Sequence, residues 1–226
     1  MNRELRAEKI IGKNNINRLK NTSILLVGLG GVGGSCLEML ARAGIGNITI
    51  VDYDIFEESN LNRQLLSLED NIGECKTLVA KKRVESINSD IIVKEINNKL
   101  DDETINEIPK TDYIIDACDD INAKVLLIKY AIKNNIKIIS SCGTGNRLDP
   151  TKLKISNIWK TEYDPLAKKL RQYLRKEGIK YKVPVVFSEE QPVIKSSGYV
   201  GSMAMVPNCA GIILASYVIN DVLKGI

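Results

Sequence analysis

The first 150 residues alternate short apolar runs with segments of helical periodicity. Apolar runs at 23–27, 47–51, 91–96, 113–117 and 136–140 predict strands. Segments at 32–43, 76–88, 101–107 and 122–134 predict helices, after an N-terminal helix at about 4–19. Strands that alternate with helices build βαβ units, so the pattern predicts an α/β fold with a mostly parallel central sheet.

The pattern changes after Asp149-Pro150. It predicts a strand at 152–158, an amphipathic helix at 165–177, a strand at 183–187 and a final helix at 210–223. The stretch 189–207 is rich in Ser, Gly and Pro, and we expect a mobile loop there. The apolar run 210–219 is too short to span a bilayer, so we expect a buried helix and no membrane association.

Composition removes several reaction classes. The chain has no histidine, which excludes Ser-His-Asp and Cys-His mechanisms and histidine-bound zinc. Its five cysteines form no C-x-x-C pair, which is typical of free thiols in a reducing compartment and argues against a zinc site. The first residues contain no apolar targeting segment. These features predict a cytoplasmic protein.

A glycine-rich loop follows the first predicted strand and opens a helix. Gly28, Gly30 and Gly33 match G-x-G-x-x-G, with Gly31 beside them, and the helix N-terminus offers free N–H groups to a phosphate. Asp52 ends the second strand, where a carboxylate commonly binds a ribose hydroxyl. The combination predicts a Rossmann-like nucleotide-binding fold, but this motif does not separate NAD from ATP.

A second group of polar residues distinguishes between NAD and ATP as the nucleotide. An enzyme that splits ATP between its α and β phosphates needs cations on the phosphates and a carboxylate for Mg²⁺. Arg63 and Lys76 could supply the cations, and Asp119, after the fourth strand, could hold Mg²⁺. The remaining candidates for nucleotide contacts are Asn60, Asn62, Gln64 and Asp116. A dehydrogenase needs the glycine loop and Asp52, but it needs none of these further residues.

The run LLVGLGGVGG…VDYD…SNLNRQ…GECK…DACDD resembles the ubiquitin-activating-type adenylyltransferases. The resemblance implies that Asp52 binds the ATP ribose, that Asn60, Arg63, Gln64 and Lys76 grip the phosphates, and that Asp119 supports Mg²⁺. It also implies a homodimer, because an arginine from the N-terminal helix of the other protomer reaches the site in that family, and Arg6 is the best match. A non-enzymatic nucleotide-binding module and an NAD-dependent redox enzyme are the alternatives from other classes.

The second half of the chain distinguishes between members of this family. Sulfur-carrier adenylyltransferases usually have two C-x-x-C pairs and commonly a cysteine in the crossover segment, whereas this chain has no cysteine between Gly143 and Asn208. The runs GNRLDPT, TEYDPLAKKLR and VFSEEQP, with the Asn208-Cys209-Ala210 that opens the last helix, are similar to tRNA threonylcarbamoyladenosine dehydratases. That resemblance implies ATP-dependent cyclisation of a threonylcarbamoyl side chain beside the tRNA anticodon. Activation of a ubiquitin-like sulfur carrier is the alternative.

Basic residues gather in the segment 151–206, which has eleven Lys and Arg and five Asp and Glu. Such a segment predicts an anionic partner, and the dehydratase resemblance makes that partner tRNA, although a solvated surface is the alternative. The candidates for phosphate contacts are Lys168, Lys169, Arg171, Arg175 and Lys176. Arg147 has two interpretations, a contact with the substrate carboxylate or a structural bond. A sulfur-transfer or cysteine desulfurase partner is left open.

We expect residues 1–150 to form the ATP-binding domain and residues 151–226 to extend the same sheet with an antiparallel part.

Overall fold

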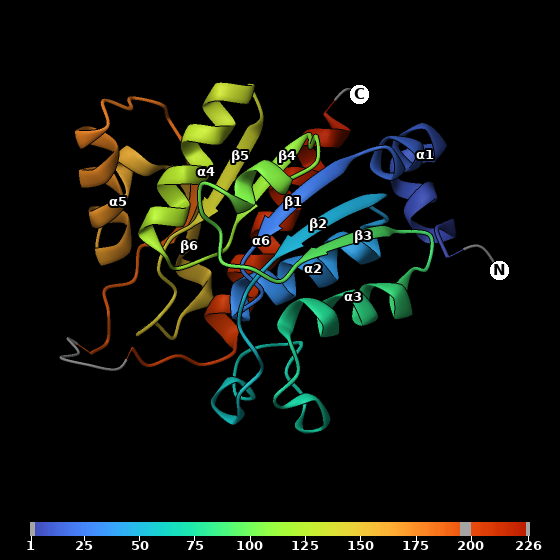
Figure 1. Ribbon diagram of the computed structural model, residues 1–226, viewed down its shortest axis with the longest axis horizontal. Helices are drawn as coiled ribbons and strands as arrows, with labels where there is room; N and C mark the ends of the chain where they lie inside the picture. The colour runs from blue at the N-terminus through green and yellow to red at the C-terminus, as the bar shows by residue number, and fades with distance from the viewer. Residues whose placement is uncertain (1–2, 195–199, 225–226) are drawn as a thin grey trace.

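The structure is a computed structural model that describes residues 3–194 and 200–224. The described residues form one seven-stranded sheet in the order β3-β2-β1-β4-β5-β7-β6 (Figure 1). Its strands are β1 (Ser23–Val27), β2 (Asn47–Val51), β3 (Ile92–Ile96), β4 (Tyr113–Asp116), β5 (Lys137–Ser141), β6 (Leu153–Asn157) and β7 (Pro184–Ser188). All neighbours are parallel except β6 and β7. The predicted fold class, with its antiparallel C-terminal part, is therefore confirmed.

Successive residues of the central strand β1 face opposite sides of the sheet, as a pleated strand requires. Ile24 and Leu26 belong to one buried cluster with α2 (Gly31–Ala43), α3 (Lys76–Ile87) and α6 (Met205–Leu223). Leu25 and Val27 belong to a second cluster with α4 (Ile121–Asn134) and α5 (Pro165–Lys176). Both faces of the sheet are thus covered by helices, which leaves the ends of the strands as the places where a site can form.

The terminal helices differ from their predicted form. The first helix, α1 (Leu5–Lys20), is interrupted at Gly12, whose φ is +76°, so its first part projects from the body (Figure 1). The last helix begins at Met205 rather than at residue 210, with Pro207 in its first turn. Proline is tolerated there because the N–H that it lacks has no partner within the helix. Part of the predicted mobile loop, residues 195–199, lies outside the described residues.

The longer α6 also changes the membrane argument. At 19 residues it is long and apolar enough to cross a membrane by length and composition alone, which the prediction from residues 210–219 missed. One side of α6 nevertheless packs against α2 so closely that a β-carbon on Gly211 would lie 2.1 Å from the carbonyl oxygen of Val32. We therefore interpret α6 as a core helix of the domain.

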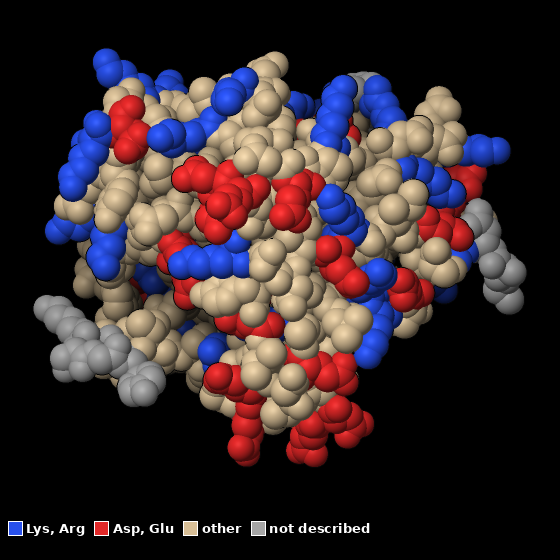
Figure 2. Space-filling view, viewed as in Figure 1, with Lys and Arg blue, Asp and Glu red and all other residues tan. Residues whose placement is uncertain are grey.

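The predicted short helix at 101–107 is a 3₁₀ turn at Thr104–Glu107. Two further 3₁₀ turns, η1 (Glu58–Asn60) and η2 (Glu69–Asn71), lie between β2 and α3. They belong to two loops that project below the sheet in Figure 1. Figure 2 shows acidic side chains gathered over this projection, which has exposed carboxylates at Glu57, Glu58, Glu69 and Asp70.

Candidate active site

A cavity of about 360 Å³ opens at the carboxyl ends of the central parallel strands. This is the edge of an open α/β sheet at which ligands bind. Nine of the predicted site residues line it: Gly28, Gly30, Gly31, Asp52, Asn60, Arg63, Gln64, Lys76 and Asp119. Residues that lie up to 91 positions apart in the chain are thus brought to one place because they all follow the strands of the same sheet.

The three glycines of the motif are each needed for a different geometric reason. Gly28 has φ +90°, and a β-carbon there would lie 2.8 Å from the backbone of Ala117. A β-carbon on Gly33 would lie 1.7 Å from the carbonyl oxygen of Gly28, so Gly33 allows α2 to pack against the loop. On Gly30 the nearest atom would be Nε2 of Gln64 at 4.0 Å. Gly30 therefore leaves open space beside the N-terminus of α2, where an anion is favoured.

Asp52 connects the glycine loop to the loop after β2. The residue is 9% exposed, and its carboxylate accepts hydrogen bonds from the backbone N–H groups of Leu29 (2.6 Å) and Asp54 (2.9 Å). Each carboxylate oxygen can accept more than one hydrogen bond, so these contacts fix the side chain without saturating it. Asp52 is therefore held at the cavity wall with acceptor capacity for a ribose hydroxyl.

The cationic side of the cavity is formed by Lys76 and Arg63. Lys76, the first residue of α3, is buried and its Nζ lies 3.0 Å from Oδ2 of Asp54. Arg63 donates to the carbonyl oxygen of Ser59 (2.7 Å) and to Oδ1 of Asn62 (2.9 Å). Both bonds use the same terminal nitrogen, and among the described residues no hydrogen bond uses the rest of the guanidinium. The two cations are thus positioned to face an anion in the cavity.

Two polar groups in the cavity are available to contact a ligand. Oε1 of Gln64 is buried without a hydrogen-bond partner among the described residues, which is costly unless a ligand donates to it. Asp119 is exposed at the rim, and no described residue forms a hydrogen bond or ion pair with its carboxylate. No group of three or more metal-ligating side chains occurs in the part of the chain that the structure describes. A Mg²⁺ ion there would need phosphate oxygens besides Asp119, as Mg²⁺ commonly does.

Asp116 does not line this cavity, contrary to the prediction. It is fully buried behind the cavity, where Nζ of Lys124 lies 3.0 Å from both of its carboxylate oxygens. Lys124 also donates to Oγ of Ser140 and to the carbonyl oxygen of Ser141, so it links the ends of β4 and β5. Burial is the largest single influence and lowers the pKa of Lys124, but the charge and hydrogen bond of Asp116, with smaller contributions from other neighbours, together outweigh it and leave the pKa raised. Asp116 is therefore a structural partner of Lys124.

Other predicted residues lie outside the cavity. Asn62 faces the C-terminal segment and donates to the carbonyl oxygen of Ser202 (2.9 Å). Gly33 lies beneath the loop, and Arg6 is exposed on the projecting part of α1. Arg147 is 3% exposed and donates to the carbonyl oxygens of Gly143, Gly145, Tyr163 and Glu190, which decides for its structural interpretation.

The basic candidates lie on or beside α5, whose outer side gathers Lys and Arg at the upper left of Figure 2. Lys168, Lys169, Arg175 and Lys176 are exposed, and the Arg175 guanidinium lies 5.5 Å from the centre of the Trp159 ring. Arg171 differs from them, because its guanidinium turns inward and donates to Thr161 and to the carbonyl oxygen of Ile158. The prediction grouped Arg171 with the other candidates for phosphate contacts because helical periodicity does not show how a long side chain bends back.

Several cavity residues were not predicted. Thr144 and Ser202 come from the segments after β5 and before α6, and Asn98 and Lys99 come from the loop after β3. Lys99 pairs with Asp120 at 3.1 Å, and this hydrogen bond raises the pKa of its ammonium group. The order of the strands could have pointed to the loops after β3 and β5, since every parallel strand ends at this edge.

The cysteines near the cavity are poor nucleophiles. Burial, followed by the charge of Asp116, raises the pKa of the Cys118 thiol well above its ordinary value. Burial likewise raises the pKa of Cys142. A protonated thiol is not the attacking species in thioester or persulfide chemistry. The arrangement therefore favours chemistry without a cysteine nucleophile.

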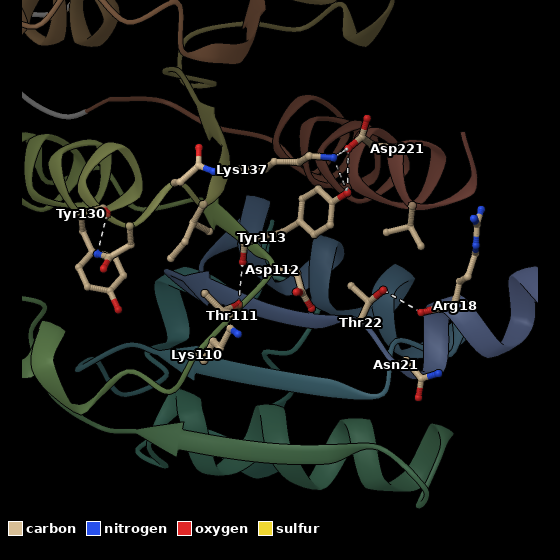
Figure 3. Close-up of a pocket in the computed structure, with 14 residues that line it drawn as sticks. Arg18, Asn21, Thr22, Lys110, Thr111, Asp112, Tyr113, Tyr130, Lys137 and Asp221 are labelled. Atoms are coloured by element: carbon tan, nitrogen blue, oxygen red, sulfur yellow. Dashed lines mark hydrogen bonds and ion pairs between the residues drawn. The ribbon is translucent and has the colours of Figure 1, made fainter. Parts of the chain in front are cut away.

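A larger and more open groove, of about 1100 Å³, lies at the opposite end of the sheet (Figure 3). Lys137, Tyr113 and Asp221 point toward one another there, with Oδ2 of Asp221 accepting from Lys137 (2.6 Å) and from the Tyr113 hydroxyl (2.7 Å). These groups satisfy one another and tie α6 to β4 and β5. The groove has no part of the glycine loop, so the smaller cavity is the candidate active site.

The fold and this cavity define a Rossmann-type nucleotide-binding protein with an anion site at the start of α2. The chain belongs to the ThiF family, because the model of that family matches residues 1–219. It is 39% identical to the tRNA threonylcarbamoyladenosine dehydratase of Bacillus subtilis, over 98% of this chain and 94% of that protein.

Solved structures show the same fold. The Escherichia coli tRNA N6-threonylcarbamoyladenosine dehydratase TcdA in complex with ATP matches with a TM-score of 0.93 and 31% identity, over 99% of this chain and 94% of that chain. The molybdopterin-synthase adenylyltransferase of Haemophilus influenzae is 36% identical, but over 58% of this chain and 54% of that protein. The resemblance to the dehydratases therefore extends through the C-terminal part, as the sequence motifs predicted.

Proposed function

We propose that this protein is an ATP-dependent tRNA threonylcarbamoyladenosine dehydratase. One observation carries the proposal. A single cavity holds the glycine loop, Asp52, Arg63, Lys76 and Asp119, in a chain that is 39% identical over nearly its whole length to a protein of that name. Activation of a carboxylate by ATP is the chemistry that such a cavity suits.

The reaction has two steps. A carboxylate oxygen of the threonylcarbamoyl side chain attacks the α-phosphorus of ATP, the bond to the β-phosphate oxygen breaks, and pyrophosphate leaves. A nucleophilic atom of the same side chain then attacks the acyl carbon and loses its proton, and AMP leaves with the former carboxylate oxygen. The nucleoside has then lost one water. Ring closure is intramolecular and has a large proximity advantage, so no cysteine nucleophile is needed.

The residues of the cavity have defined roles in this proposal. Asp52 accepts from the ribose, and the N-terminus of α2 faces the phosphates. Arg63 and Lys76 stabilise the charge that develops as pyrophosphate leaves. Mg²⁺, when bound, would be held by Asp119 with phosphate oxygens and would neutralise part of the same charge. Asn60 and Gln64 orient the triphosphate.

The basic outer face of α5 is proposed as the tRNA surface. Lys168 and Lys169 lie at the end of α5 nearest the cavity, since Asp164, which caps this helix, accepts from the backbone N–H of Gly143 (2.8 Å) beside Thr144. Arg175 and Lys176 lie in the last turn, farther from the cavity. A row of cations leading away from the cavity suits an RNA stem whose loop enters it. The proposed location is the cytoplasm.

We further propose a homodimer in which Arg6 completes the partner's site. The projecting part of α1 has exposed cations at Arg6 and Lys9 and an apolar Ile10 that is 86% exposed. The loops next to the cavity present the opposite charge, with Leu68 60% exposed just before the acidic Glu69 and Asp70. Charge and apolar area match between α1 of one protomer and these loops of the other, which would bring Arg6 toward the partner's Arg63 side.

The test is to incubate the purified protein with ATP, Mg²⁺ and tRNA from a strain that lacks this gene, and to analyse the nucleosides by mass spectrometry. We expect threonylcarbamoyladenosine to lose one water, with one AMP formed for each. If the mass is unchanged and pyrophosphate exchange depends on an added sulfur-carrier protein, the assignment moves to the sulfur-carrier class.

A further inference from the structure

Tyr163 has an unusual backbone conformation. Its φ is +54°, in the left-handed region that costs residues with a β-carbon free energy and that is rare for a bulky side chain. Its side chain is not buried in return, because the residue is 51% exposed. Residues held in such conformations cluster at functional sites, where the surrounding structure imposes the strain.

The strain is imposed by two buried side chains. The Arg147 guanidinium donates to the carbonyl oxygen of Tyr163 (3.0 Å) and to that of Gly143 (2.9 Å). The next residue, Asp164, accepts from the backbone N–H of Gly143 (2.8 Å) and from that of Ala167 (2.9 Å), where it caps α5. Both sides of Tyr163 are therefore fixed to the loop after β5, and its ring is held outward rather than in the core.

The position of the ring is as informative as its conformation. Gly143 is followed by Thr144, which lines the nucleotide cavity, and Tyr163 is followed by α5 with the exposed Lys168 and Lys169. Tyr163 thus lies where the cavity rim meets the basic helix. Among the described residues, none forms a hydrogen bond with its hydroxyl group.

We propose that Tyr163 is a base-stacking residue, which holds an unpaired nucleotide of the RNA next to the nucleotide that enters the cavity. Bases of single-stranded loops stack on aromatic rings when they are splayed out, and this contact does not need a particular base. A ring that is already held outward loses little conformational freedom on binding. The inference rests on the proposed function, because the RNA must approach this cavity.

The experiment compares Tyr163→Ala, Tyr163→Gly and Tyr163→Phe with the unaltered protein. The matched control is Tyr181→Ala, because Tyr181 is a similarly exposed tyrosine just before β7. Its carbonyl oxygen accepts from Trp159 beside Arg175, so it lies at the end of the basic surface away from the cavity and tests whether the effect is specific to the rim. Three quantities are measured for each: the Kd for tRNA, the kcat and KM of dehydration, and the midpoint of thermal unfolding.

Loss of one stacked base corresponds to roughly a tenfold change in affinity. We expect Tyr163→Ala and Tyr163→Gly to raise the Kd and KM for tRNA about tenfold, with the KM for ATP and the kcat at saturating tRNA unchanged. Tyr163→Phe keeps the ring and stays close to the unaltered protein, as does Tyr181→Ala. Tyr163→Gly unfolds at the same or a higher temperature, since glycine adopts a positive φ without strain.

Unchanged tRNA affinity in the Ala and Gly variants would overturn the inference. So would a Phe variant as weak as the Ala variant, or a loss of affinity that follows a lower unfolding temperature in every variant. If the unaltered protein binds tRNA through Tyr163 but removes no water, the proposed function fails while this inference stands.

Discussion

Asp119 allows the metal assignment to be tested at the scale of one residue. Replacing it by Asn removes the negative charge, and because the side chain is exposed and unpaired among the described residues, the fold should not change. We expect the rate of AMP formation to fall on the order of 100-fold, as when one group that stabilises transition-state charge is removed, with an unchanged unfolding midpoint. The adjacent Asp120 is the control, because it caps α4 and pairs with Lys99, and Asp120→Asn should keep the rate.

The buried thiols give a second test at this scale. Burial raises the pKa of Cys36, Cys118 and Cys142, so at pH 8 these thiols stay protonated in the folded state. We expect iodoacetamide, which reacts with thiolates, to leave all three unmodified until the protein is unfolded, as mass spectrometry of peptides would show. Rapid alkylation of Cys118 in the folded protein would contradict this assignment and revive a persulfide route.

The same thiols make stability depend on pH. A thiol whose pKa is raised by folding stabilises the protein fully at pH values below its unfolded pKa of 9.0. The unfolded chain ionises above that pH while the folded chain does not, so stability falls as pH rises further. We expect each of the three thiols to lower the free energy of unfolding by at most about 1.4 kcal/mol per pH unit above 9. The slope of unfolding free energy against pH should therefore become less steep in Cys36→Ala.

Single residues were predicted best where a local pattern fixes their role. Asp52 and the three glycines follow strands that the periodicity places correctly, so their geometry is local. Asp116 follows the same rule but was wrongly placed in the cavity, because its partner Lys124 comes from the next helix and the chain does not show that pairing. The role of Arg147 could not be decided from the sequence for the same reason, since its four acceptors come from loops that meet only in the folded chain.

At the scale of elements, two glycines at the start of α2 have different roles, because one allows the helix to pack and the other leaves space for a phosphate. In Gly33→Ala, the new β-carbon would overlap the carbonyl oxygen of Gly28, which should destabilise the fold by ~3 kcal/mol. In Gly30→Ala, the β-carbon has room within the protein but occupies space that a phosphate needs. We expect Gly30→Ala to unfold normally and to bind ATP at least about tenfold more weakly, as calorimetry of unfolding and binding would show. Equal behaviour of the two variants would contradict the separate roles.

Helix α5 allows the RNA surface to be tested. The salt dependence of tRNA binding reports how many phosphates the protein neutralises. Neutralising Lys168, Lys169 and Lys176 together should lower the slope of log K against log salt by roughly 2 to 3. Arg171 is left out because its inward bonds support the fold. Lys82→Gln on α3, in the helix layer of the opposite face, is the control, and an unchanged slope in the triple variant would place the RNA elsewhere.

Most elements were predicted from periodicity to within one or two residues, but the interruption of α1 at Gly12, the 3₁₀ turn at Thr104–Glu107 and the start of α6 were not. β1 and β2 have the predicted bounds because short apolar runs between glycines and polar residues are typical of buried parallel strands. The start of α6 was missed because the stretch that ends at Pro207 is rich in Ser, Gly and Pro, which suggested a loop. A proline in the first turn is compatible with a helix, but only the packing of Gly211 on α2 shows that the helix is there.

At the scale of the whole molecule, the exposed side of α6 is consistent with the proposed homodimer. Its apolar window is 39% buried, and Ile212 on its outer side is 43% exposed. A helix that is apolar on all sides usually packs on all sides. An exposed apolar face of this kind supports association of two chains, together with the charge match between α1 and the loops beside the cavity.

Complementation between two variants of low activity tests the dimer and the role of Arg6 together. In a mixed dimer of Arg6→Ala and Asp119→Asn, the protomer that lacks the arginine keeps its Asp119 and receives Arg6 from its partner, so one of the two sites is complete. If about half of the dimers are mixed after exchange, activity should recover to about a quarter of the unaltered value, although each variant alone keeps only a small residual activity. Light scattering checks that both variants remain dimers. No recovery from mixed dimers that are shown to form would mean that Arg6 does not act across the interface.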